Sequence, residues 1–293
     1  MIAVVCNDAG SAEIISSWLI LQNEGYVLVL DGPALGIFTR KISNIKTHSL
    51  DDALKQADWL ITGTSIFSSL ELDAIAKSKE MNLKSVTFLD HWANYLQRFI
   101  KDNKQLLPDE LWAGDNYAYE MAKSIFPDTK VILENNAYFK SIKTASNILK
   151  KQNLYNKKSE YILYLCSPVA AHAKLVHGDE KYWGYDEHDR IKYFMLNLHK
   201  LNASSKKVVL RLHPSEKVRK YNWVLDEFGP FVSMSDNKTL LEQILESEVV
   251  VGSNSMGLAI AIIAGKRAVS SLAPDDAKCT IPMKELEHLS SIS

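Results

Sequence analysis

The sequence predicts an α/β protein made of two tandem doubly wound domains, each a parallel β-sheet with helices on both faces. Short runs of β-branched residues alternate with stretches that carry apolar residues at helical spacing. This alternation stops at a polar segment, residues 152–160, and then starts again, and the length of 293 residues exceeds one typical domain. We therefore expect domains at 1–152 and 153–293 that face each other across a central cleft.

In the first half, short apolar runs predict strands and longer periodic stretches predict helices. The predicted strands are Ile2–Cys6, Tyr26–Leu30, Trp59–Thr62, Ser85–Leu89, Leu111–Gly114 and Lys130–Glu134. The predicted helices are Ser11–Asn23, Asp51–Gln56, Leu70–Lys79, Tyr117–Phe126 and Ser141–Lys151. Asp31 and Gly32, which follow the second strand, resemble a plain turn.

The second half repeats the pattern. The predicted strands are Tyr161–Cys166, Val208–Leu212, Phe231–Met234, Val249–Val251 and Ala268–Ser271. The predicted helices are Glu187–Leu201, Tyr221–Phe228, Leu240–Glu246 and Met256–Ala264. The stretch Ala170–Tyr185, rich in His, Gly and charge, is predicted to be a long loop.

A small polar turn in the second half is the strongest candidate for anion binding. Gly252 breaks a valine run, and Ser253, Asn254 and Ser255 stand directly before the apolar stretch Met256–Ala264. The free N–H groups of a helix N-terminus at this place would favour phosphate. Ser and Asn are also ordinary N-cap residues, so helix capping without any ligand is the alternative.

Two other strand ends of the second half carry residues suited to the same anion. Arg211 belongs to a predicted strand that ends in His213 and Pro214, and the imidazole of His213 can donate to a phosphate oxygen. Ser167 follows another strand end. Because ligands of parallel sheets bind beyond the carboxyl ends of the strands, we expect these residues and the Gly252–Ser255 turn to surround a diphosphate or a nucleoside monophosphate without any metal.

The first half offers candidates for proton transfer. Asp8 stands at the end of the first strand, and Gly10 allows the backbone to approach a ligand there. Asp90 and His91 leave a buried-type strand as an adjacent carboxylate and imidazole. The alternatives are that Asp8 or Ser11 caps the following helix, with Glu13 as an acid of its first turn, and that the aromatic residues after His91 are only core.

Composition excludes several classes of function. Lys plus Arg number 34 and Asp plus Glu 35, so there is no basic excess for nucleic-acid binding. The three cysteines and the histidines at 172, 177 and 188 lack metal-ligand spacing, so no metal site and no cofactor are predicted. Without a signal pattern or an apolar run of about 18 residues or more, we expect a cytoplasmic protein with no integral membrane segment.

The two halves and the candidate residues at their strand ends resemble the GT-B fold of sugar-nucleotide glycosyltransferases. Two Rossmann-like halves, RLHP on a strand and GSNS in a later turn resemble, more narrowly, the bacterial sialyltransferase, polysialyltransferase and Kdo-transferase group. Enzymes of that group use CMP-activated ulosonic acids, and their HP histidine and serine turn contact the nucleotide phosphate. The resemblance therefore implies donor roles for His213 and for Ser253–Ser255.

The same resemblance implies an acidic base in the first half. The acidic-acidic-Gly motif of the group has no clear counterpart here, because Asp31-Gly32 matches it only in part. The base is therefore assigned by position to Asp8 or Asp90, with His91 as a rival.

The expected function is metal-independent transfer of a sugar from a nucleotide donor to a hydroxyl of a bacterial surface glycan, as in capsule or lipopolysaccharide synthesis. Its partners would be the nucleotide sugar and a glycan or lipid-linked glycan, and peripheral association with the inner membrane stays open. The alternatives are a sugar-nucleotide hydrolase or epimerase of the same architecture and a non-catalytic two-lobed sugar-binding protein.

Overall fold

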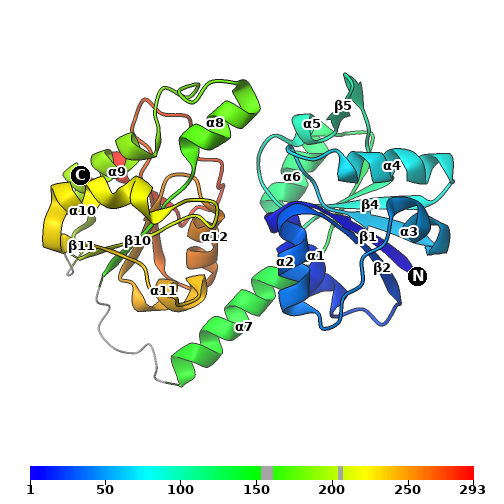
Figure 1. Cartoon of the computed structure of the whole chain (residues 1–293), viewed down its shortest axis with the longest axis horizontal. Helices are drawn as coiled ribbons and strands as arrows, with labels where there is room; N and C mark the ends of the chain where they lie inside the picture. The colour runs from blue at the N-terminus through cyan, green and yellow to red at the C-terminus, as the bar shows by residue number, and fades with distance from the viewer. Residues whose placement is uncertain (153–160, 204–206) are drawn as a thin grey trace. The chain divides into compact units, whose positions relative to one another are not determined.

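The computed structural model describes residues 1–152, 161–203 and 207–293 (Figure 1). The chain forms two compact units, Met1–Ser141 (unit 1) and Ile142–Ser293 (unit 2), and the division falls within helix α7 (Ala137–Lys151). The segment expected to separate the domains lies, except for Gln152, outside the described residues. Both units are α/β, as predicted.

Unit 1 contains a six-stranded parallel sheet with the strand order β2-β1-β3-β4-β7-β8. Its strands are β1 (Ile2–Cys6), β2 (Tyr26–Leu30), β3 (Trp59–Thr62), β4 (Lys84–Leu89), β7 (Glu110–Ala113) and β8 (Lys130–Leu133). Its helices are α1 (Ala9–Leu19), α2 (Gly32–Lys41), α3 (Leu50–Gln56), α4 (Leu70–Glu80), α5 (Tyr95–Arg98) and α6 (Asn116–Ile125), and β5 (Ile100–Lys101) pairs with β6 (Lys104–Gln105) in a small hairpin.

Unit 2 contains a second six-stranded parallel sheet, with the order β11-β10-β9-β12-β13-β14. Its strands are β9 (Ile162–Leu165), β10 (Val208–Arg211), β11 (Val232–Met234), β12 (Val249–Gly252), β13 (Arg267–Ser270) and β14 (Glu287–His288). Its helices are α8 (Val169–His177), α9 (Glu187–Leu196), α10 (Asn222–Phe228), α11 (Leu240–Glu246) and α12 (Met256–Ile263), with short 3₁₀ turns η1 (Leu198–Leu201), η2 (Val218–Tyr221), η3 (Gly229–Phe231) and η4 (Leu289–Ser291).

The sequence of β1 shows why the sheet of unit 1 is covered on both faces. All five residues of β1 are buried. Ile2, Val4 and Cys6 pack in one core cluster with residues of α1 and α2, whereas Ala3 and Val5 pack in another with residues of α3 and α4. Since successive side chains of a strand point to opposite faces, a continuous apolar run is what a doubly covered strand requires.

The strand orders fix where ligands of such sheets bind. When the six strands of each sheet are numbered from one to six along the chain, the spatial order is 2-1-3-4-5-6 in unit 1 and 3-2-1-4-5-6 in unit 2. The direction of winding changes between β1 and β3 in unit 1 and between β9 and β12 in unit 2. Doubly wound sheets bind ligands beyond the carboxyl ends of the strands at these switch points.

Two local predictions are wrong. Asp31 and Gly32 are not a plain turn but the start of α2: the Asp31 carboxylate accepts the Gly32 N–H at 2.7 Å, and Pro33 lies in the first helical turn, where no N–H is needed. The stretch Ala170–Tyr185 is not a loop throughout, because α8 occupies its first part and ends at Gly178, whose φ of 78° closes the helix.

Candidate active site

The Ser253–Ser255 turn lies at the switch point of unit 2, directly against the end of β9. A Cβ atom added to Gly252 would lie 3.3 Å from the Cβ and the carbonyl oxygen of Leu165, and one added to Gly257 would lie 2.4 Å from Leu165 Cδ1. Glycine at these two positions therefore lets the turn and the first turn of α12 approach β9 closely.

Inside this turn the polar side chains already have protein partners. Ser255 Oγ accepts the Gly257 N–H at 3.2 Å and caps α12. This is the helix-capping role that was the alternative to phosphate binding at this turn. Asn254 Oδ1 accepts from the backbone N–H of Thr280 at 3.1 Å and from the Thr280 hydroxyl at 3.0 Å. Ser253 is buried, and its carbonyl accepts the Ser270 hydroxyl at 2.7 Å. The turn is thus rigidly held, and the loop after β13 is fixed to it through Asn254.

His213 lies two residues beyond β10, at the same edge of the sheet, because β10 and β12 both run parallel to β9. Its Nδ1 accepts the backbone N–H of Ser215 at 3.3 Å and lies 2.7 Å from the Ser215 hydroxyl. An Nδ1 that accepts a hydrogen bond leaves the ring proton on Nε2, which is therefore the donor available to a ligand. Loss of hydration lowers the pKa of His213, and the charge of Glu216 acts in the opposite direction. Pro214 follows, exposed like His213.

Arg211 and Ser167 take different positions around this edge. Arg211 Nη1 donates to the Lys238 carbonyl at 2.9 Å and to Gln243 Oε1 at 2.5 Å, so its guanidinium braces the loop that precedes α11. Ser167 is half-buried, and its carbonyl accepts the Val169 N–H at the start of α8. Ser167 thus stands beside the switch point.

In unit 1 the candidates Asp8 and Asp90 follow β1 and β4, on either side of the end of β3. Asp8 is half-buried, and its Oδ1 accepts the Ser65 hydroxyl at 2.9 Å. It occupies the N-cap position of α1 but makes no capping hydrogen bond, so capping does not account for it. Burial, together with the negative charge of Asp90, raises the pKa of Asp8 to about 6.

Asp90 is held in a fixed ion pair. Its Oδ1 accepts the Thr64 hydroxyl at 2.8 Å and lies 3.4 Å from Arg98 Nη1, and Arg98 also donates to the Thr64 hydroxyl at 2.6 Å. A Cβ atom added to Gly10 would lie 2.3 Å from Asp90 Oδ2, so only glycine lets α1 begin this close to the carboxylate. Asp90 is thereby bound to structural partners, and its side chain is only 7% exposed. His91 follows Asp90, half-buried, with its ring 6.1 Å from that of Trp92.

Sequence reasoning missed a third carboxyl group, Glu71, in the first turn of α4. Glu71 is 2% exposed, its Oε1 accepts the Asn7 N–H at 2.7 Å, and its Oε2 is buried without a hydrogen-bond partner among the described residues. Burial, reinforced by the charges of Asp8 and Asp90, raises the pKa of Glu71 to about 7. Asp8, Glu71 and Asp90 form what we call the carboxyl cluster, and it lies at the switch point of unit 1.

Replacing Glu71 with glutamine is expected to stabilise the protein above pH 7. The folded-state pKa of Glu71 is raised from 4.5 to about 7, so folding favours the protonated carboxyl group. The stability that this proton provides is complete below pH 4.5 and is lost as the pH rises through 7. Glutamine keeps the acceptor for the Asn7 N–H without the charge, and we expect a gain of about 2 to 3 kcal/mol at pH 8. Urea unfolding at pH 5 and pH 8 measures it.

The control for this prediction is Glu80→Gln, which removes an exposed carboxylate from the same helix. The stability difference between Glu71→Gln and the native protein should grow between pH 5 and pH 8, and the control should show no such growth. An equal difference in the free energy of unfolding at both pH values would mean that the ionised Glu71 carboxylate does not destabilise the fold.

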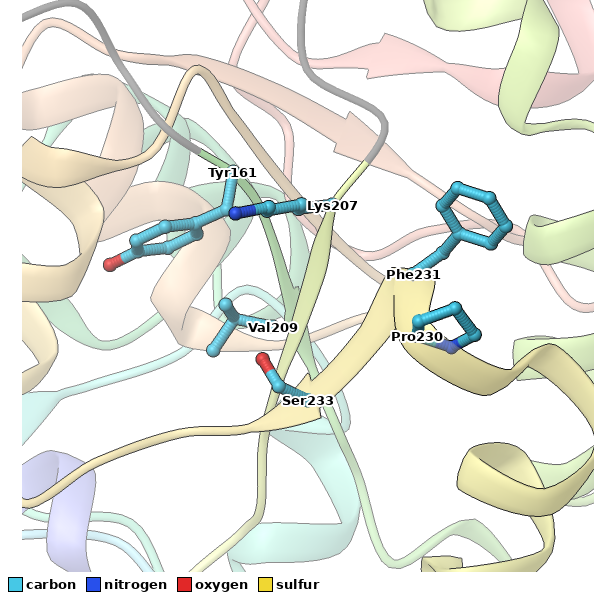
Figure 2. A pocket seen from close by; sticks show the side chains of 6 residues that line it. All are labelled: Tyr161, Lys207, Val209, Pro230, Phe231 and Ser233. Carbon is cyan, nitrogen blue, oxygen red and sulfur yellow. The ribbon is translucent and has the colours of Figure 1, made fainter.

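A separate hollow of about 320 Å³ lies in unit 2 at the ends of the strands opposite to those that carry the candidate residues (Figure 2). It is lined by Tyr161, Lys207, Val209, Pro230, Phe231 and Ser233. Tyr161, Lys207 and Phe231 precede β9, β10 and β11, so the hollow lies at the amino ends of these strands. None of the candidate residues lines it.

Other expected features can be placed in the described part of the chain. Cys6 and Cys166 are buried, Cys279 is half-buried, and all three are free thiols. No group of three or more His, Cys, Asp or Glu residues that could hold a metal ion occurs among residues 1–152, 161–203 and 207–293. Within the same residues, none of the helices has the length and apolar character needed to cross a bilayer.

Comparison with known proteins identifies the architecture. No protein-family model matches the sequence, and a search of curated proteins gives no significant match. Solved structures do match: UDP-GlcNAc 2-epimerase from Methanocaldococcus jannaschii has a TM-score of 0.61 at 11% identity, covering 92% of this chain and 83% of that one. UDP-GlcNAc 2-epimerase from Neisseria meningitidis bound to UDP-GlcNAc has a TM-score of 0.58 at 13% identity, covering 92% and 81%.

A glycosyltransferase from Rickettsia africae ESF-5 is similar as well, with a TM-score of 0.52 at 10% identity over 92% of this chain and 78% of that one. At such identities a structural likeness establishes the fold alone. The chain has the GT-B-like α/β architecture of two Rossmann-type domains that these epimerases and glycosyltransferases share.

Proposed function

We propose that the protein is a glycosyltransferase that moves a sugar from a nucleotide donor to a hydroxyl group of a bacterial surface glycan. The observation that carries the proposal is the placement of His213 and the Ser253–Ser255 turn at one edge of one sheet, on either side of the β9 end. An imidazole donor and a capped helix N-terminus at a switch point suit the phosphate of a nucleotide.

In this proposal unit 2 binds the donor. The Nε2–H of His213 and the first-turn N–H groups of α12 stabilise the negative charge that develops on the departing phosphate, so that no metal ion is required for this role. Asn254, Ser253 and Arg211 act by holding the loops in place, since their side chains or carbonyls are bonded to neighbouring segments. Ser167 supplies a hydroxyl beside the same turn.

Unit 1 activates the acceptor. Asp8 takes the proton from the acceptor hydroxyl, whose oxygen bonds to the anomeric carbon while the bond from that carbon to the phosphate oxygen breaks. A pKa of about 6 leaves most Asp8 ionised at neutral pH while keeping it a stronger base than an ordinary aspartate. Asp90, paired with Arg98, supplies a negative charge that helps to raise the pKa of Asp8. His91 is the remaining rival as base. The acceptor is a glycan or lipid-linked glycan.

The donor class we favour is a CMP-activated ulosonic acid, on the strength of the RLHP and GSNS segments. A thermal-shift screen with CMP, CDP, UDP and GDP tests the proposal. A nucleotide at 100 times its dissociation constant should stabilise the protein by about 2.7 kcal/mol, which corresponds to a rise in Tm of several degrees. CMP should give the largest shift.

Cytidine and uridine, which lack the phosphate, are the matched controls and should shift Tm less than CMP and UDP. Larger shifts with UDP than with CMP would replace the ulosonic acid by a UDP-sugar. No shift with any nucleotide would contradict nucleotide-sugar binding altogether.

A second candidate is epimerisation or hydrolysis of a nucleotide sugar. It is favoured by two neighbouring carboxyl groups, Asp8 and Glu71, whose pKa values of about 6 and about 7 suit an acid and a base of one site. It is also favoured by the likeness to UDP-GlcNAc 2-epimerases. Conversion of a UDP-sugar without any acceptor would establish it, and strict dependence on an acceptor would exclude it.

A further inference from the structure

A network of charged groups, which we call the Lys220 network, joins the half-buried Lys220 to two buried carboxylates in unit 2. Lys220 Nζ is paired with Glu187 Oε1 and, at 2.7 Å, with Glu216 Oε1. The side chains of the two carboxylates are only 8% and 3% exposed, respectively. The Tyr221 hydroxyl, on a fully buried ring, donates to Glu216 Oε2 at 2.5 Å. Both oxygens of Glu216 are therefore bound.

The network ties together the loops at the ends of β9 and β10. Glu187 Oε2 accepts the Ala170 N–H at 2.9 Å, which fixes the first turn of α8 just after β9. The backbone N–H of Glu216 donates to the His213 carbonyl at 2.9 Å, which closes the turn that carries the imidazole. Lys220 bonds both carboxylates, so the beginning of α8 and the His213 turn are held at a fixed separation.

The charges of the network do not cancel. Two carboxylates, Glu187 and Glu216, face one ammonium group, Lys220, so one negative charge is left over in a largely buried place. A buried charge without its own partner is costly to keep in a fold. Its electrostatic effect reaches His213, where the charge of Glu216 raises the pKa of the imidazole against the lowering caused by lost hydration.

We propose that Glu216 is a positioning residue for His213: held by Lys220 and Tyr221, it fixes the turn that carries the imidazole, and its negative charge acts on the ring whose Nε2–H meets a nucleotide phosphate. The identity of the ligand rests on the proposed function, whereas the coupling between Glu216 and His213 rests on the network itself. Neither the fold nor the likeness to solved structures assigns this role.

The test is a proton NMR titration of the His213 ring, assigned by its loss in His213→Asn. Glu216→Gln keeps an acceptor for the Tyr221 hydroxyl but removes the charge, so the titration midpoint of His213 should fall by about half to one pH unit. Lys220→Met removes the cation and leaves both carboxylates, so the midpoint should rise. Opposite shifts in the two variants are what an electrostatic role requires, because a general loosening of the loop would move both in one direction.

Glu227→Gln is the matched control, because Glu227 pairs with Lys192 at 3.4 Å on the surface and should leave the midpoint unchanged. Binding of CMP is measured in parallel, and Glu216→Gln should weaken it about five- to tenfold while Glu216→Asp restores part of the loss. Circular dichroism establishes that each variant is folded, and either charge variant alone gives the direction of the shift if the other does not fold.

An unchanged His213 midpoint in folded Glu216→Gln, or shifts of the same sign in both charge variants, would overturn the proposal. Failure of the native protein to bind any nucleotide would instead remove the proposed function, and the titration would still report on the coupling of Glu216 to His213. The two failures are therefore distinguishable.

Discussion

Replacing Asp8 with asparagine is expected to lower kcat for sugar transfer by about 10²- to 10⁴-fold, because a positioned general base contributes that much to proton transfer. Asparagine is nearly isosteric and can still accept the Ser65 hydroxyl through its side-chain oxygen, which lies 2.9 Å from the Ser65 Oγ in the native protein. The binding of the nucleotide donor, assigned to unit 2, should be unchanged. Initial rates at saturating donor and acceptor measure the loss.

The pH dependence of turnover by the native protein tests the same assignment independently. Since the pKa of Asp8 is raised to about 6, the group is protonated and inactive as a base below that pH. We expect kcat/KM to fall about tenfold per pH unit on the acid side of pH 6 and to level off above it. Ser65→Ala removes a hydrogen bond that lowers the pKa of Asp8, so the acid limb should move to higher pH.

The control for Asp8→Asn is Asp128→Asn, which removes an exposed carboxylate of unit 1. It should leave the rate and the pH profile as they are. An Asp8→Asn variant with native turnover would exclude Asp8 as the base, and loss of activity on changing His91 alone would transfer the role to His91.

The strands were predictable because a doubly covered sheet requires uninterrupted apolar runs, and this pattern is local. Ile2–Cys6, Tyr26–Leu30 and Trp59–Thr62 have the predicted bounds. Helix α12 was likewise predictable, because it is apolar all round and its residues Gly257–Ala261 are buried without a break. The starts of α2 and α8 were missed, because α2 begins with Gly32 and Pro33 and α8 follows Pro168, and both residue types also suit a turn.

The candidate site was predictable only as far as strand ends reveal it. Asp8, Asp90 and His213 lie one or two residues beyond the ends of strands, so the rule for parallel sheets finds them. Glu71 was missed because a glutamate in the first turn of a helix usually serves the helix dipole, and nothing local shows that it is 2% exposed beside two other carboxyls. The partners of Asn254 and Arg211 come from segments 26 to 32 residues away in the sequence, which no local pattern reveals.

Replacing His213 with alanine is expected to lower kcat about a hundredfold or more. Removing one preorganised donor from a developing negative charge typically raises the barrier by about 2.7 to 4 kcal/mol, and the Nε2–H of His213 is the donor in question. The loss should be larger in kcat than in the affinity for the nucleotide sugar, since the phosphate gains charge as the bond to the sugar breaks.

The fold should tolerate this change, because His213 is exposed and, among the residues that the structure describes, its ring bonds to Ser215 of its own turn. We expect the free energy of unfolding to change by no more than about 0.5 kcal/mol. His199→Ala is the matched control: His199 is also an exposed histidine of unit 2, but it lies in η1 before β10, at the amino ends of the strands. Turnover that stays at the native level in His213→Ala would exclude the imidazole from the reaction and leave the first turn of α12 as the remaining anion donor of unit 2.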